Sequence, residues 1–432
     1  MHELEWRKAL TTGDEAVVVH LMPTLIASID TDGLTALHVA AREGHEKLVS
    51  RLLTARPCLI DALDHRGATA LHFAARAGHH HVVSQLMAAG PQLIGKIDNL
   101  GSSALHAAAR NGHEAVVAQL LAASPVLTSS TAWPGDTALH FAALGGHDGV
   151  VAQLLAAYPG LINVVNRTGW TALFVAADRG HTKVVARLLA ASEPGLVNVP
   201  CKLGWTALHA AANKGHDKIV AQLLAASEPG LINVCKLGLT PLHIAARGGH
   251  EKVVTQLLAA NPKLLHAVTG EGKTALHVSL ERERGPVAEM LLAMESDMKY
   301  EVDNLGNTWL HCATRGCHKE LIERIWALNP GALRATNYNN MTPFHVAVDC
   351  INDWAVELFQ WSLSLDEIVP AFERYGVSAE ERFRPVIEMQ CGPVLDLHLN
   401  RDVVGTVYEY LGFKIGNKRD VVIEPEDNED DS

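Results

Sequence analysis

Histidine and cysteine are the residue types in this chain best suited to metal binding or catalysis. The sequence has 24 histidines and seven cysteines. The triplet His79-His80-His81 offers imidazole ligands, but no cysteine or carboxylate at suitable spacing accompanies it. Cys391 and His398 lie seven residues apart, and such spacing alone does not establish Cys–His catalysis. We also find no G-x-S-x-G, P-loop or kinase-type motif. The sequence therefore predicts no catalytic residue, no metal site and no cofactor.

Most of the histidines recur at fixed positions, which indicates a structural role. Nine of them close a four-residue pattern, T-A-L-H or a close variant, and eight more stand at a Gly-His position further along the copies. The pattern occurs ten times, with starts 34 residues apart except for one step of 35 between Thr171 and Thr206. A period of this size indicates stacked supersecondary units rather than one globular core. The copies start at residues 35, 69, 103, 137, 171, 206, 240, 274, 308 and 342.

One copy, residues 30–61, shows what each unit should form. Residues 30–33 read as a turn, and Thr35 is the expected N-cap of a first helix. Gly44 ends that helix, and Pro57 ends a second helix that begins at Glu46. One helical hairpin cannot bury both of its sides, so each copy must stack on its neighbours. The expected apolar face of the second helix is Leu48, Val49, Leu52 and Leu53.

These copies resemble the ankyrin repeat, whose consensus reads DxxGxTPLHxAAxxGHxxVVxxLL. The resemblance covers residues 30–361 and implies an all-α fold: an elongated, curved α-solenoid of helix-turn-helix repeats with short hairpin-like turns. It also implies that the T-x-L-H histidine ties one turn to the next. Many ankyrin repeats have a Gly-Ala turn after the second helix, whereas this chain has a proline followed by an apolar residue, as at Pro57–Ile60.

The regions outside the array have other expected roles. Residues 1–29 resemble a degenerate repeat that caps the N-terminus, and residues 424–432 read as a disordered acidic tail. Residues 362–423 read as a helical C-terminal cap or a short adaptor-binding segment. Within them, residues 395–413 resemble the opening of an F-box, or a SOCS-box segment, although Asn400 stands where the F-box has proline.

Two sets of variable residues are candidates for partner binding. In the ankyrin fold the turns project as fingers, and copies five to seven carry apolar residues there, next to a tryptophan on the preceding turn. A second set is a row of arginines seven residues after the first threonines, on the expected concave face. Tryptophan is frequent at binding hot spots, and the guanidinium fork suits carboxylates or phosphates. Packing between fingers and a solvated helix face are the alternatives. The candidates are Trp133, Trp170, Leu203, Trp205, Leu237, Leu239, Arg42, Arg76 and Arg110.

Charge and hydropathy limit the class of partner. The net charge is −12, and six of those negative charges lie in residues 424–432, so we expect no nucleic-acid partner. The first ten residues do not resemble a signal peptide, and no apolar run would span a membrane, which favours a cytoplasmic or otherwise intracellular protein. The predicted function is a non-catalytic scaffold or adaptor that binds proteins. The alternatives are a substrate-recognition subunit of a ubiquitin ligase, which would bind a ligase adaptor through residues 395–413, and an effector enzyme with its activity in residues 362–423.

Overall fold

The protein is described by a computed structural model that covers residues 29–192, 195–227, 235, 237–294 and 301–360, with the single positions 362, 363, 367 and 371. The expectations for the N-terminal cap, the segment 395–413 and the acidic tail lie outside these residues, apart from position 29. The described residues contain twenty α-helices and two strands of two residues each, which confirms the expected all-α fold. They contain no helix that is both long enough and apolar enough to cross a membrane.

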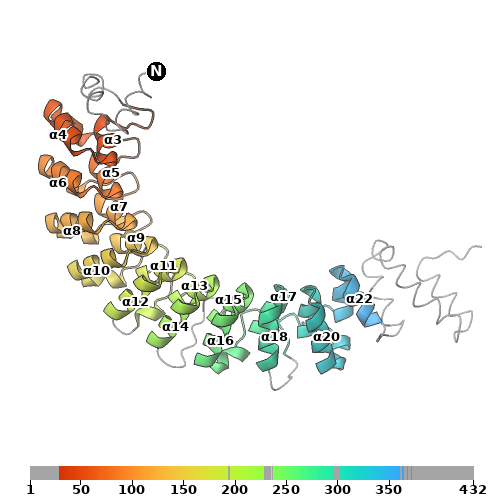
Figure 1. The fold of residues 1–432 in the computed structure, drawn as a ribbon. Helices are drawn as coiled ribbons and strands as arrows, with labels where there is room; N and C mark the ends of the chain where they lie inside the picture. Colours follow the sequence, from red (N-terminus) through yellow and green to blue (C-terminus); the bar gives the residue numbers. More distant parts are fainter. Residues whose placement is uncertain are drawn as a thin grey trace, which may run out of the picture. The chain divides into compact units, whose positions relative to one another are not determined.

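The chain divides into two compact units, residues 1–270 and 271–432. The first unit contains copies one to seven, and each copy forms a pair of antiparallel helices (Figure 1). Its first helices are α3 (Ala36–Glu43), α5 (Ala70–Ala77), α7 (Ala104–Asn111), α9 (Ala138–Gly145), α11 (Ala172–Arg179), α13 (Ala207–Lys214) and α15 (Pro241–Gly248). Its second helices are α4 (Glu46–Ala55), α6 (His80–Ala89), α8 (Glu114–Ala123), α10 (Asp148–Ala157), α12 (Thr182–Ala191), α14 (Asp217–Ala226) and α16 (Glu251–Ala260).

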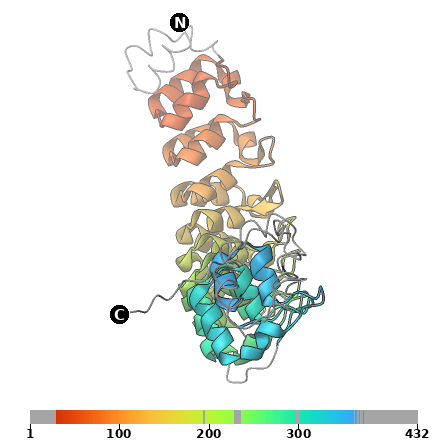
Figure 2. The same cartoon turned by 90° about the vertical axis from the view of Figure 1, so that its right-hand side faces the viewer.

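The helix pairs of the first unit stack in chain order. Each first helix packs on the first helix of the next copy, and each second helix packs on the next second helix, as the ladder from α3 to α10 shows from two sides (Figures 1 and 2). The core between the layers consists of Ala, Leu and Val side chains such as Leu37, Ala40, Val49 and Leu52. Small residues let the helices approach closely, which explains why so few aromatic residues are needed.

The second unit repeats the arrangement with copies eight to ten. Its first helices pack on one another in chain order, and so do its second helices. The first helices are α17 (Ala275–Glu281), α19 (Trp309–Arg315) and α21 (Pro343–Asp349). The second helices are α18 (Gly285–Met294), α20 (Lys319–Leu328) and α22 (Asp353–Gln360).

The expected start and end of each first helix are confirmed in the first copy. Thr35 is the N-cap of α3, and Gly44 is its C-cap with φ of 78°. The proline after the second helix does more than end it. Pro57 opens a 3₁₀ turn, η1 (Pro57–Asp61), which buries Leu59 and Ile60. The corresponding turns are η2 (Pro91–Gly95), η3 (Pro125–Ser129), η4 (Pro159–Asn163), η5 (Leu196–Asn198), η6 (Pro262–His266) and η7 (Pro330–Arg334).

The histidine of the T-x-L-H pattern closes a capping box and also links neighbouring copies. The backbone N–H of Thr35 donates to His38 Nδ1 at 3.0 Å, and His38 Nε2 lies 3.2 Å from the carbonyl oxygen of Ala68 in the next copy. Because Nδ1 accepts a hydrogen bond, the proton of the neutral ring sits on Nε2, which donates to that carbonyl. Burial lowers the pKa of the His38 imidazole and keeps it neutral.

The histidine of the Gly-His position forms a second set of links between copies. His79 Nε2 lies 2.9 Å from the carbonyl oxygen of Arg42, at the end of the preceding first helix. The same contact joins His113 to Arg76 and His147 to Arg110. The carbonyl groups at these helix ends are therefore satisfied by the next copy.

The fingers are short hairpins between the 3₁₀ turns and the first helices. The clearest one pairs β1 (Thr131–Ala132) with β2 (Asp136–Thr137) in antiparallel register. Single bridges join Ile29 to Thr35 and Ile97 to Ser103 in the first unit, and Val302 to Thr308 in the second. Backbone hydrogen bonds also join consecutive fingers, for example from Asn99 N to Arg66 O. The fingers are thus held in place by their neighbours.

Candidate partner-binding surface

The arginine row lies at the last turn of the first helices, where the next copy fixes its backbone. The carbonyl groups of Arg42, Arg76 and Arg110 each accept a hydrogen bond from a histidine of the following copy. A cation in the last turn also interacts favourably with the helix dipole, so these positions have a structural role as well. These hydrogen bonds hold only the backbone of the three arginines. Their guanidinium groups have different surroundings.

Arg76 and Arg110 line a cleft of about 600 Å³ on the finger side of copies two to four. Its wall includes Arg66, from the finger that precedes α5, and the indole of Trp133, from the β1–β2 finger. Phe141 of α9 contributes a second aromatic ring. The structure therefore brings together three of the residues that the sequence singled out, Arg76, Arg110 and Trp133. Arg42 is absent from this lining, and its Nε forms an ion pair with Glu43 Oε1 at 2.8 Å.

The charges of the cleft are not balanced by ion pairs. Among the described residues no salt bridge involves Arg66, Arg76 or Arg110, and the Arg76 guanidinium lies over the Phe73 ring at 5.9 Å. The cleft also contains Asp98 and Asp136. Three positive charges thus face two negative ones in a water-accessible hollow lined with aromatic rings.

Both aspartates of the cleft accept hydrogen bonds within the fold. Asp98 Oδ1 accepts from the backbone N–H groups of Leu100 and Ser102, at 2.9 and 2.8 Å, which shapes its own finger. Asp136 Oδ1 accepts from Asn166 Nδ2 at 2.7 Å and thereby joins two fingers. Neither carboxylate forms an ion pair with a cleft arginine in the described residues.

The apolar candidates form a separate group on the fingers of copies five to seven. Leu203 and Leu237 are 69% and 70% exposed, and Trp170 is 37% exposed. Trp205 and Leu239 are only half-buried, so they present less surface than a fully exposed finger residue would. Trp133 is 66% exposed but belongs to the cleft.

The two tryptophans of this apolar group also pack within their own copies. The ring of Trp170 stacks on Phe174 at 5.1 Å between centroids, and that of Trp205 stacks on His209 at 6.1 Å. The residue just before each first threonine is not always exposed, since Leu34 and Ala68 are buried in the first two copies. The outermost position lies three residues before the threonine, where Leu203 and Leu237 stand, because the hairpin turns there.

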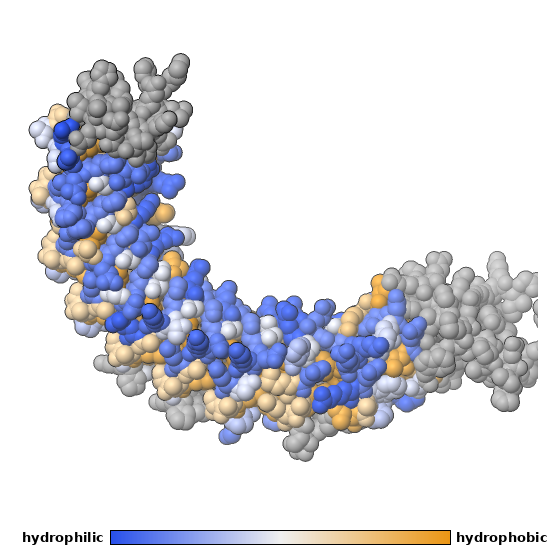
Figure 3. Space-filling view, in the orientation of Figure 1, coloured by the Kyte–Doolittle hydropathy of each residue, from blue (hydrophilic) through white to orange (hydrophobic). Residues whose placement is uncertain are grey.

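The face seen in Figure 3 is largely hydrophilic over the fingers and first helices of the first unit, and apolar residues gather along the edge formed by the second helices α4, α6, α8 and α10. Exposed leucines stand at the fingertips of three copies of this unit, at Leu100, Leu203 and Leu237. The sequence singled out three of the residues that line the cleft, Arg76, Arg110 and Trp133. It missed Arg66, because the residues at that finger position vary from copy to copy and only their common position around the cleft relates them.

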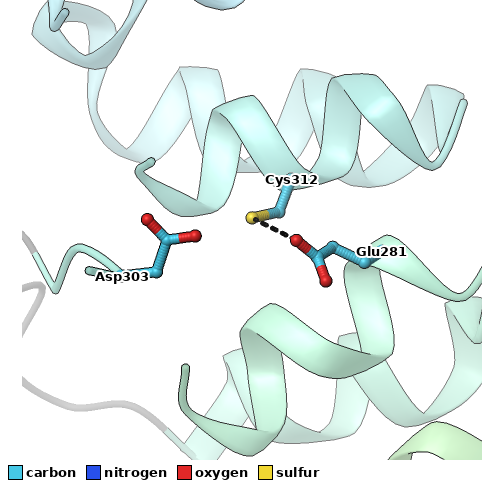
Figure 4. A group of neighbouring side chains, drawn as sticks. All are labelled: Glu281, Asp303 and Cys312. Carbon is cyan, nitrogen blue, oxygen red and sulfur yellow. Dashed lines mark hydrogen bonds between the residues drawn. The ribbon is translucent and has the colours of Figure 1, made fainter. Parts of the chain in front are cut away.

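One group of potential metal ligands exists among the described residues, and it lies in the second unit. It consists of Glu281, Asp303 and Cys312 (Figure 4). Glu281 Oε2 forms an ion pair with Lys273 Nζ at 2.9 Å, and the Cys312 thiol points to Glu281 Oε1 at 3.9 Å. Burial raises the pKa of the Cys312 thiol and keeps it protonated.

Asp303 is also committed to the fold. Its Oδ1 accepts hydrogen bonds from the backbone N–H groups of Leu305 and Asn307, and its Oδ2 accepts from Asn307 Nδ2. A metal ligand would need a deprotonated thiol and carboxylate oxygens that are not already paired with a cation. The donor set suits a buried polar network better than a metal site.

The histidine triplet 79–81 and the pair Cys391 and His398 are the remaining residues considered for metal binding or catalysis. The His79 ring of the histidine triplet bonds to the Arg42 carbonyl, which leaves its Nε2 unavailable as a ligand. The rings of His80 and His81 lie 4.0 Å apart between centroids and are not part of a ligand group in the described chain. Cys391 and His398 lie outside the described residues.

Comparison with known families agrees with this architecture. The family described as ankyrin repeats (3 copies) matches residues 8–94, 56–130, 82–161, 105–196, 139–233, 188–266 and 221–301. These overlapping matches span more than half of the chain. A comparison with curated proteins found no match. Copies nine and ten lie beyond the matched residues, yet they form the same helix pairs, α19 with α20 and α21 with α22. The chain belongs to the ankyrin-repeat family.

Proposed function

We propose that this protein is a non-catalytic scaffold or adaptor that binds partner proteins through the fingers and first helices of its first unit. Ankyrin repeats generally mediate protein–protein interactions. The observation that carries the proposal is the pair of exposed leucines, Leu203 and Leu237, at equivalent fingertips of consecutive copies, beside the exposed Trp170. Apolar side chains that project from a polar surface are typical of a protein-binding site.

The fingers are ordered before a partner arrives, which favours binding. The backbone N–H of Lys202 donates to Thr168 O at 3.1 Å, and Gly270 N donates to Leu237 O at 3.0 Å. Each finger is thus held by the next one. Binding to such a surface loses little conformational entropy, so more of the contact free energy appears as affinity.

The test removes the fingertip leucines without disturbing the core. We expect proteins captured from the native cell by the full chain to be lost with the Leu203→Ser, Leu237→Ser double variant. Val126→Ser is the matched control, because Val126 is equally exposed but lies on η3, away from the fingertips. Quantitative mass spectrometry and thermal unfolding would compare the three proteins. Identical capture by all three would contradict the proposal.

The two alternative functions rest on residues that lie almost wholly outside the described part of the chain. A ubiquitin-ligase subunit would need residues 395–413 to bind a ligase adaptor, and an effector enzyme would need residues 362–423 to fold into an active domain. The repeats would serve as the partner-binding part in both cases. Deleting residues 395–423 separates these functions from the proposed one, because fingertip-dependent capture should survive the deletion.

A further inference from the structure

The cleft of copies two to four has a chemistry distinct from the apolar fingertips. We infer that it binds an acidic segment of a partner protein, with two carboxylates on Arg76 and Arg110 and an apolar side chain against Trp133. This inference rests on the proposed protein-binding function and names the partner chemistry for one part of the surface. It goes beyond the family assignment, because the residues that line the cleft vary among the copies.

Arginines at the same position of other first helices are paired with carboxylates. Arg315 of the second unit occupies the row position of Arg76 and Arg110, seven residues after its first threonine. Its Nη1 lies 3.7 Å from Glu281 Oε1, and Glu281 also pairs with Lys273. In the first unit, Arg42 pairs with Glu43.

Arg76 and Arg110 lack any such carboxylate in the described residues. The guanidinium groups that share this hollow repel each other, and the two aspartates of the cleft leave one positive charge in excess for a ligand to balance. Each guanidinium fork matches the geometry of a carboxylate through two parallel hydrogen bonds. Arg66, on the finger side, adds a third unpaired cation to the same wall.

The spacing of Arg76 and Arg110 matches an extended peptide segment. They stand on the equivalent turns of α5 and α7, which pack on each other as neighbouring first helices. Packed helices lie about 8–10 Å apart, so the two side chains start about that far apart. A segment in polyproline II conformation rises about 3.1 Å per residue with three residues per turn, which puts residues i and i+3 on one face about 9 Å apart. The matching ligand is therefore an extended segment with acidic residues at i and i+3.

The aromatic side of the cleft favours an apolar residue in the ligand. Trp133 and Phe141 line the cleft beside the arginines, and the Trp133 side chain is mostly exposed. A proline or leucine of the ligand would bury apolar surface against the indole, as proline-rich segments do in aromatic grooves. A nucleic acid is a weaker fit, because it is recognised by an extended basic surface, whereas three arginines and two aspartates are clustered here and the chain carries a net charge of −12.

The test uses synthetic peptides with the full-length chain and isothermal titration calorimetry. The probe has a Glu-Pro-Pro-Glu core followed by leucine, and its matched control has Gln-Pro-Pro-Gln. We expect the glutamate peptide to bind at least about tenfold more tightly, because charge-assisted hydrogen bonds are roughly twice as strong as neutral ones. Equal binding of the two peptides, or no binding of either, would overturn the inference.

Variants of the chain assign the binding to the cleft. Arg76→Gln with Arg110→Gln should weaken the glutamate peptide about tenfold or more, whereas Arg51→Gln, an exposed arginine on α4, should change its affinity less than about twofold. Arg110→Lys keeps the charge but removes the fork, so it should give an intermediate loss. Circular dichroism would check that each variant is folded. A loss with Arg51→Gln as large as that with the double variant would contradict a cleft site.

Two further probes distinguish the class of ligand. A phosphoserine version of the peptide and a single-stranded oligonucleotide of equal length should both bind less tightly than the glutamate peptide. Tighter binding of either one would reject the acidic segment as the ligand. The proposed function fails separately, because it depends on capture through Leu203 and Leu237. Fingertip-dependent capture without peptide binding would reject this inference and leave the protein-binding function intact.

Discussion

The two units build the same helix pairs with different residues at the end of each first helix. In the first unit that position is always glycine with φ between 72° and 83°. In the second unit, Glu283, Cys317 and Ile351 occupy it with φ of 54° to 57°. The backbone conformation is therefore kept while the residue that adopts it most readily is lost.

Over the glycines from Gly44 to Gly215, the next copy places a histidine ring. A Cβ atom added to Gly146 would lie 2.6 Å from Nδ1 of His181, so the histidine contact excludes any side chain there. In the second unit, Asn352 replaces that histidine and its Nδ2 donates to Thr314 O at 3.0 Å. The shorter side chain links the tenth copy to the ninth at a carbonyl one residue earlier than the one that the histidines contact. The histidine contact therefore adds to the restriction that φ sets at these glycines. It does not decide the residue type alone, since the eighth copy has Glu283 at this position and the ninth copy keeps His318.

The second difference lies in the charges on the first helices. The second unit pairs Glu281 with Lys273 and Arg315, whereas the first unit leaves Arg76 and Arg110 without carboxylate partners in the described residues. The first unit therefore combines regular packing with two arginines that form no ion pair in the described residues.

Both units contain buried, neutral T-x-L-H histidines, and their protonation in acid should give the largest effect, a loss of stability. Burial lowers the pKa of His106 and His209 in the first unit, and of His277 and His311 in the second, to about 4. As the pH falls, these histidines become protonated near pH 6.5 in the unfolded chain but only near pH 4 in the folded chain. Stability is therefore full above pH 6.5 and falls as the pH drops from about 6.5 to about 4. The expected loss is about 1.4 kcal/mol per pH unit for each such histidine.

Urea denaturation at pH 7 and pH 5 measures this loss, and the chain offers its own control. The fifth copy has Phe174 at the histidine position, and α11 still forms with Thr171 as its N-cap. His209→Phe should therefore keep the fold and reduce the pH dependence by about one proton. An unfolding free energy that is the same at both pH values would contradict a neutral, buried histidine ladder.

The next largest effect should come from adding a side chain at a glycine of the first unit. Gly146→Ala should destabilise the protein by about 2–3 kcal/mol. The left-handed conformation costs an L-residue about 1–2 kcal/mol, and displacement of His181 weakens its contact with Leu144 O, worth about 0.5–1.5 kcal/mol. Chemical denaturation measures the change. Gly95→Ala is the control, since its added Cβ would meet no atom within 4 Å. Equal effects of the two substitutions would show that the histidine does not restrict the turn.

Much of the fold could be predicted from the sequence because its signals are local and repeated. The N-cap threonines, the ends of the first helices and the apolar faces depend on neighbours within one copy. The links between copies could not be predicted in the same way. The contact of Asn352 with Thr314 joins residues 38 apart, and its residue type breaks the Gly-His pattern.

The candidate surface was predicted in part, for a related reason. Periodicity identified Arg76 and Arg110 as one row, and the structure places both in the cleft. The sequence grouped Trp133 with the apolar fingers of copies five to seven, whereas its ring lines the cleft with the arginines. The direction of a fingertip side chain depends on the conformation of its hairpin, which residue spacing does not give.

The smallest effect should be a gain of stability in the second unit when its strained position receives glycine. Ile351 has φ of 57°, so the backbone of this β-branched residue adopts an unfavourable conformation. The residue is 50% exposed, so its side chain buries only part of its surface. Relief of this strain, worth about 1–2 kcal/mol, exceeds the extra unfolded-state entropy of glycine, which costs about 0.5–1 kcal/mol. Ile351→Gly should therefore stabilise the unit by about 0.5–1 kcal/mol, measured by the urea dependence of unfolding. Asn340→Gly is the matched control, because Asn340 has φ of 55° and asparagine tolerates this region, so little change is expected. A loss of stability with Ile351→Gly would show that contacts of the isoleucine side chain outweigh its backbone strain.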